Sequence, residues 1–95
     1  MKKYEIMYIV KSNLDDEARK AEIAKIHSTI EGAGAKITNI NEWGIRDFAY
    51  PIKDEIKGYY VVLKVTAEPG SLKEFERLAK LNVNVLRYLI TNDQD

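Results

Sequence analysis

The stretch KGYYVVLKV, residues 57–65, decides the fold, because its alternation shows which face of a sheet each side chain occupies. Within the strand that we predict over residues 59–66, one set of alternate positions is apolar throughout: Tyr59, Val61, Leu63 and Val65. The other set contains Lys64, and burying an unpaired lysine is strongly unfavourable. We therefore expect the apolar set to face a core, and Tyr60, Val62 and Lys64 to face outward.

Three further stretches have the composition of strands. Residues 3–10 alternate, with Glu5 on the outward set and a set expected to face the core: Tyr4, Ile6, Tyr8 and Val10. Residues 35–52 are long for one strand; Gly44 predicts a bulge or bend within them, and Pro51 indicates an edge strand or a strand end. In residues 85–90 we expect the set without a charge to face inward: Leu86, Tyr88 and Ile90.

Two amphipathic segments predict helices. The first can be capped by Ser12 or Asn13, and it ends at the glycines of residues 32–34. Its apolar stripe has helical spacing: Ile23, Ile26 and Ile30. The second starts at Ser71, which has the spacing of a capping box with Glu74 in the first turn. Its stripe is Leu72, Phe75, Leu78 and Ala79.

The resulting order, β-α-β-β-α-β, predicts an α+β protein with a ferredoxin-like βαββαβ sandwich. Two helices would cover one face of a four-stranded antiparallel sheet, with the first and third strands in the middle. The length predicts a single domain over residues 1–95. Since no helix is left to cover the second sheet face, we expect function on that open face.

Composition excludes several classes. The chain has 15 basic and 15 acidic side chains, whereas a protein that binds nucleic acid with its whole surface is usually basic. Any RNA contact should therefore be local, or shared with a positively charged partner. The lack of cysteine excludes disulfides and thiolate metal sites. The apolar runs are too short to span a bilayer, and Glu5 interrupts the N-terminal one, so we expect no signal peptide.

The quoted stretch also resembles the RNA-contacting strand of an RNA-recognition motif, which starts with a basic residue, glycine and an aromatic residue. The outward stacking positions of that motif fall on Tyr59 and Val61, which we place inward. Tyr60 is then the outward aromatic residue of the two central strands. A stacking platform needs aromatic residues on both strands, so an independent binder of single-stranded RNA is a weaker hypothesis.

The outward apolar residues of the two central strands predict a patch instead: Met7, Ile9, Tyr60 and Val62. A contiguous exposed apolar patch is typical of a protein-binding surface, although scattered apolar residues on a surface are ordinary. We therefore predict that a protein partner binds the open face through these four residues.

Catalytic chemistry is not indicated. The lone histidine, His27, flanks the apolar stripe of the first helix and has no second histidine to share a metal. The acids of residues 15–17 suit the first turn of a helix, and the loop KSNLDDE, residues 11–17, has no glycine-rich phosphate cradle. We expect no enzyme, no metal site and no cofactor.

The most specific segment is WGIRDFAYPIK, residues 43–53. It resembles the signature of the bacterial small-subunit ribosomal protein S6 family, through Gly44, Arg46, Asp47, Ala49, Tyr50, Ile52 and Lys53. Phe48 replaces the usual leucine, at a position that we place inward. The opening MKKYEIMYIV is similar to the start of that family, and the resemblance covers essentially the whole chain.

The resemblance implies a structural component of the small ribosomal subunit in the cytoplasm. Such a protein binds small-subunit ribosomal RNA together with ribosomal protein S18, as a heterodimer, and no small-molecule substrate. The candidate RNA-binding residues are Lys2, Lys3, Arg46, Lys53, Lys57 and Arg87. Each of the lysines is equally compatible with an ordinary solvated charge. The alternative is a small regulatory or ligand-binding ferredoxin-like module that homodimerises through its open sheet face.

Overall fold

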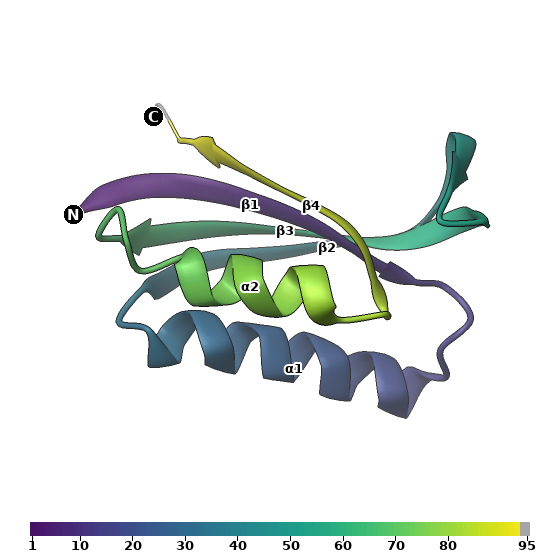
Figure 1. The fold of residues 1–95 in the computed structure, drawn as a ribbon, viewed down its shortest axis with the longest axis horizontal. Helices are drawn as coiled ribbons and strands as arrows, with labels where there is room; N and C mark the ends of the chain where they lie inside the picture. The colour runs from purple at the N-terminus through teal and green to yellow at the C-terminus, as the bar shows by residue number, and fades with distance from the viewer. Residues whose placement is uncertain (94–95) are drawn as a thin grey trace.

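The computed structural model describes residues 1–93 and has the predicted order of elements. Their bounds are β1 (Lys2–Lys11), α1 (Asp16–Gly32), β2 (Lys36–Ile52), β3 (Glu55–Ala67), α2 (Lys73–Leu81) and β4 (Val85–Asn92). The antiparallel sheet has the strand order β2-β3-β1-β4, and both helices lie on one side of it (Figure 1). The ferredoxin-like prediction is therefore confirmed. Neither helix of the described residues is both long and apolar enough to cross a membrane.

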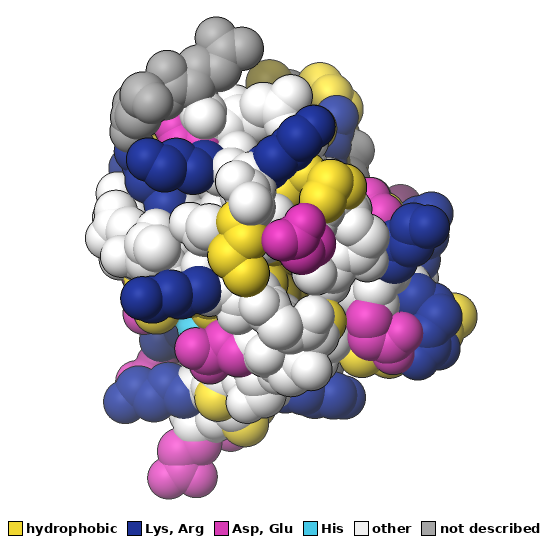
Figure 2. Space-filling view, turned by 90° about the vertical axis from the view of Figure 1, so that its left-hand side faces the viewer, with side chains coloured by type: hydrophobic (Ala, Val, Ile, Leu, Met, Phe, Trp, Pro, Cys, Tyr) yellow, Lys and Arg dark blue, Asp and Glu magenta, His cyan; other side chains and the backbone are white. Residues whose placement is uncertain are grey.

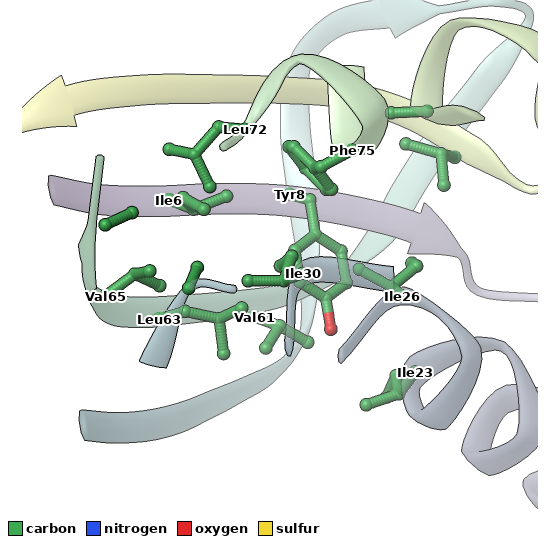
Figure 3. Packing of buried hydrophobic residues seen from close by; sticks show 14 of the residues in the cluster. Ile6, Tyr8, Ile23, Ile26, Ile30, Val61, Leu63, Val65, Leu72 and Phe75 are labelled. Atoms are coloured by element: carbon green, nitrogen blue, oxygen red, sulfur yellow. The ribbon is translucent and has the colours of Figure 1, made fainter. Parts of the chain in front are cut away.

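The core lies between the helices and the predicted inward faces of the two central strands. Its strand residues are fully or almost fully buried: Ile6, Tyr8, Val10, Val61, Leu63 and Val65. Figure 3 shows the Tyr8 ring among Ile30, Val61 and Phe75, where the sheet meets both helices. Burying each such aliphatic side chain contributes about 1.5–3 kcal/mol, so this register of β3 is strongly favoured. The position of Lys64 in the sequence therefore identified correctly which face of β3 packs against the helices.

The start of α1 differs from the prediction. Asp15 is the N-cap, and its carboxylate accepts a hydrogen bond from the backbone N–H of Ala18 at 2.7 Å. Ser12 and Asn13 belong to the turn before it, so the predicted cap was wrong by two or three residues. The helix end is as expected, because Gly34 has φ +93°, a left-handed conformation that glycine adopts easily.

The start of α2 also differs, because the capping box does not form. Leu72 takes the N-cap position with helical backbone angles and no side-chain cap, and its side chain is buried in the core. Glu74 pairs instead with Arg77 one turn later. The start of this helix is therefore set by the burial of Leu72 and not by a hydrogen bond from the hydroxyl of Ser71.

The predicted irregularity of β2 is a bulge at Trp43. Glu42 pairs with Val61 and Gly44 pairs with Tyr60, which leaves Trp43 as the extra residue. Gly44 has φ +86°, where a side chain would be strained. The bulge changes the parity of everything that follows it in β2.

The β2–β3 hairpin bends near its tip. Asp47 pairs with Lys57, but the next pair is Ile52 with Glu55, so four residues on one strand face one on the other. The bend carries the hairpin beyond the ends of the helices and away from the helical layer (Figure 1). The broken register places Phe48 on the sheet face turned away from the helices, while Lys53 in the turn stays close to the start of β4.

The last strand also contains an irregularity. Ile9 pairs with Arg87 and Val10 with Val85, which leaves Leu86 as the extra residue. Val85 joins the core, whereas Leu86 is buried outside that cluster. Tyr88 and Ile90 pack against the core as predicted, so the expected facing was correct for these two and wrong for Leu86.

Candidate protein and RNA interface

The sheet face turned away from the helices, which we call the outer face, is built from two neighbouring cross-strand rows. One row runs across the four strands as Leu89, Met7, Val62 and Asn41. The next row is Arg87, Ile9, Tyr60 and Gly44. The four residues predicted to bind a protein partner are thus neighbours on this face.

Three aromatic side chains meet over this face, and we call them the aromatic cluster: Trp43, Phe48 and Tyr60. The Trp43 and Tyr60 rings stack, with centroids 6.0 Å apart and an angle of 11° between the ring planes. Phe48 lies at 6.1 Å from Tyr60 in a tilted arrangement. The guanidinium carbon of Arg46 lies 5.5 Å from the centroid of the Trp43 ring, within cation–π range. These contacts give the edge of the outer face a fixed aromatic surface.

Phe48 was predicted to face inward, and that prediction is wrong. Its ring lies over Gly58, where an added Cβ would clash with both Phe48 and Ile9. The bulge at Trp43 reverses the alternation after Glu42, which places Arg46 and Phe48 on the outer side. Trp43 and Phe48 are therefore site residues that simple alternation missed. The Trp-Gly pair at the predicted bulge was the signal that could have identified Trp43.

The predicted patch is less exposed than we expected. Ile9 is 2% exposed and Val62 is 9% exposed, while Met7 and Tyr60 are half-buried. Ile9 lies next to Phe48 of the folded hairpin, and Val62 is a short side chain between larger neighbours.

The accessible apolar surface of the outer face comes from other residues. Trp43 is 45% exposed and Leu89 is 53% exposed, one on each edge of the sheet. The four residues of the predicted patch lie mostly beneath this surface.

The predicted RNA-binding cations do not form one group. Arg46 and Arg87 are both exposed on the outer face, on opposite edge strands. Lys57 lies 3.9 Å from Asp47 across the hairpin, where both side chains are exposed. Lys53 lies in the hairpin turn, and its Nζ donates a hydrogen bond to the Val85 carbonyl at 3.3 Å.

Lys2 and Lys3 lie at the opposite end of the sheet, where they pair with Ala67 and Thr66. Ile9 lies six positions after Lys3 in β1, which corresponds to about 20 Å of strand. Figure 2 shows the end of the molecule opposite the hairpin, where basic and acidic side chains are interspersed. The two lysines are thus too far away to share a phosphate with the hairpin.

His27 serves the structure on the helical side of the sheet. Its Nε2 lies 2.9 Å from the Tyr8 hydroxyl in a hydrogen bond between α1 and β1. Burial lowers the pKa of His27 and raises the pKa of Tyr8. Within residues 1–93, no group of three metal-binding side chains converges.

Comparison with known proteins adds two findings. The family model described as ribosomal protein S6 matches residues 3–92. The chain belongs to the ribosomal protein S6 family. It is also similar to the crystal structure of 30S ribosomal protein S6 from Thermotoga maritima, with a TM-score of 0.92 and 27% sequence identity. That match covers 97% of this chain and 87% of the other.

Membership of the S6 family gives the signature segment, residues 43–53, a structural meaning. It forms the outer part of the hairpin, from the bulge at Trp43 to the turn at Lys53. Its glycine permits the bulge, its arginine contacts the Trp43 ring, and its phenylalanine covers Gly58. In this S6 protein the signature therefore shapes the edge of the outer face.

Proposed function

We propose that this S6-family protein, a component of the small ribosomal subunit, binds small-subunit ribosomal RNA jointly with ribosomal protein S18. In this proposal S18 binds the outer face, and RNA contacts the pair. The observation that carries the proposal is the aromatic cluster with Arg46 at the edge of a sheet face that no helix covers. Catalysis is not part of this role, and its place is the ribosome in the cytoplasm.

The outer face has the composition of a protein-binding surface. Tryptophan, tyrosine and arginine are enriched among the residues that contribute most to protein–protein affinity. Trp43 already lies beside both Tyr60 and Arg46, so it would lose little freedom on binding.

The charge distribution favours shared RNA binding. RNA affinity depends strongly on the number of phosphates that cations neutralise. This chain has a formal net charge of zero, and its predicted RNA-binding cations are spread over both ends of the sheet. A partner that adds positive charge beside Arg46 and Arg87 would complete a basic surface that this chain lacks alone.

The test is to measure binding of a central-domain ribosomal RNA fragment to this protein, to S18 and to the two mixed. We expect the mixture to bind at least about tenfold more tightly than either protein alone, a coupling of about 1.4 kcal/mol. Equal RNA affinity of the isolated chain and the mixture would contradict the proposal and favour an independent RNA binder. A stable symmetric homodimer that excludes S18 would favour the regulatory-module alternative.

A further inference from the structure

Three lysines line one hollow of about 220 Å³ at the hairpin end of the molecule: Lys11, Lys53 and Lys80. They come from the end of β1, the β2–β3 turn and the last turn of α2. Leu81, Asn82 and Val83 complete the lining, which contains no carboxylate among the described residues. The hollow far exceeds the roughly 15 Å³ that one water requires.

Lys53 lines this hollow from a turn with an unusual backbone. Lys53 has φ +50° and Asp54 has φ +66°, so both residues of the turn lie in the left-handed region. Asparagine and glycine adopt that conformation with less strain, so lysine is an unfavourable choice for the turn alone. Its Nζ donates to the Val85 carbonyl, which anchors the hairpin tip at the start of β4. Local strain that the surroundings maintain in this way indicates a role for the side chain.

The elements that carry the other two lysines bring them to the same hollow. The backbone N–H of Lys11 donates to the Asn84 carbonyl at 2.9 Å, which ties the end of β1 to the loop before β4. Lys80 lies in the last turn of α2, where a positive charge offsets the partial negative charge of the helix end. That partial charge is about half a unit, so three lysines leave the hollow clearly positive.

The nearby carboxylate of Glu22 is already engaged. Its Oε1 accepts hydrogen bonds from the side-chain amides of Asn82, at 2.7 Å, and Asn84, at 3.4 Å. Glu22 lines the neighbouring groove between the helices rather than the lysine hollow. Lysines that share a hollow repel one another, and an anion between them removes that repulsion.

We propose that this three-lysine hollow binds a backbone phosphate of the ribosomal RNA. The inference rests on the proposed function and adds Lys11 and Lys80 to its RNA contacts. Lysine recognises phosphate as a point charge and releases the counterions of the RNA. The exposed apolar side chains of Leu81 and Val83 beside the lysines suit contact with ribose carbons.

The test compares two variants that lose the same charge. The hollow variant carries Lys11→Gln, Lys53→Gln and Lys80→Gln. The control carries Lys20→Gln, Lys36→Gln and Lys73→Gln, at exposed lysines outside the hollow. Binding to the central-domain RNA fragment is measured with S18 present, from about 50 to about 200 mM salt. Relative to the control, we expect the hollow variant to bind at least tenfold more weakly, with a salt slope shallower by about one to two phosphate contacts.

Misfolding is excluded with a second variant, Lys11→Gln with Lys80→Gln, which keeps the bond between Lys53 and Val85. We expect it to lose part of the RNA affinity without a change in melting temperature. Loss of affinity in the triple variant alone, together with a lower melting temperature, would mean a disrupted turn and would overturn the proposal.

The remaining outcomes separate this inference from the proposed function. If wild type binds RNA with S18 and the hollow variant matches the control, the hollow is not the phosphate site and the proposed function stands. If wild type with S18 does not bind RNA, both are wrong. Titration of the isolated chain with pyrophosphate, with NMR chemical shifts as the readout, tests whether a free phosphate is the ligand. Binding in the hollow with unchanged RNA affinity of the hollow variant would assign the site to a small anion and overturn the RNA assignment.

Discussion

At the scale of single residues, Gly58 is a point of close packing between Phe48 and Ile9 on the outer face. A Cβ at this position would meet the Ile9 side chain and lie 2.6 Å from Cζ of Phe48. Its backbone conformation is not the left-handed one, so the requirement for glycine here comes from space alone. Gly58 therefore allows the hairpin to fold onto the sheet.

We predict that Gly58→Ala lowers the free energy of unfolding by about 1–3 kcal/mol, because it overpacks the contact between Phe48 and Ile9. Urea denaturation of the full chain measures the change. Gly70→Ala is the matched control, since an added Cβ there meets nothing within 4 Å. Equal stability of the two variants would show that the hairpin does not pack on the sheet as described.

His27 gives a second prediction, on the dependence of stability on pH. Burial lowers its pKa in the folded state, so between the folded and unfolded pKa values the unfolded chain binds more protons. The contribution of His27 is therefore present above about pH 6.5 and is lost as the pH falls below it, at up to about 1.4 kcal/mol per pH unit.

The measurement is the free energy of unfolding of wild type and His27→Gln between pH 7.5 and pH 5, with about half-unit steps. Other groups titrate equally in both proteins, so their difference isolates His27. We expect the advantage of wild type to shrink as the pH falls. A difference that is constant over this range would contradict the burial of a neutral imidazole.

At the scale of elements, the β2–β3 hairpin is a support for Trp43. The bulge at Trp43, which Gly44 permits, turns Trp43 onto Tyr60, and the bend after Asp47 brings Phe48 against the same ring. Each aromatic contact contributes about 0.5–1.5 kcal/mol beyond buried area, enough to hold the cluster without a partner. The outer face is thus shaped before anything binds to it.

We predict that Trp43→Ala weakens S18 binding at least about tenfold, because it removes the exposed aromatic residue of the cluster. Ile40→Ala is the matched control, since Ile40 is 49% exposed on the same strand but pairs with Leu63 on the helical face. Calorimetry of each variant with S18 gives both affinities. Similar losses for the two variants would place S18 elsewhere on the protein.

At the scale of the whole molecule, the sequence predicted the layers better than the details. Lys64 was enough to orient β3, because the cost of burying a lysine exceeds any local preference. The helix caps were not predictable in this way, since alternative caps such as Ser12 and Asp15 differ by only about 1 kcal/mol. Tertiary packing decides between options so similar in energy.

The edge strands of the outer face were the part that alternation could not predict. Alternation along a strand holds only while the register is unbroken, and the bulges at Trp43 and Leu86 break it on both edges. Gly44 indicated one bulge, but its consequence for Phe48 requires knowing which residue is extra. The three-lysine hollow was harder still to predict, since successive members are 42 and 27 residues apart in sequence and meet through the fold alone.

A further prediction concerns the distribution of stability. The central strands pair on both sides, whereas residues 48–51 lie where the register of the hairpin is broken. We expect amide hydrogen exchange to be slowest in residues 61–65 and at least about a hundredfold faster in residues 48–56. Exchange measured by NMR on the isolated chain tests this. Equal protection of both segments would mean that the tip unfolds only together with the core.

The strand order has a consequence for synthesis of this protein on a ribosome. β1 is made first, yet its two sheet neighbours are β3 and β4, so it has no partner until more than half of the chain has been translated. Loops that long close slowly, and an early unpaired strand can pair wrongly with other chains. The alternating inward set of β1, with Tyr8 at its centre fully buried in the folded chain, is therefore an apolar segment that stays unpaired during much of synthesis.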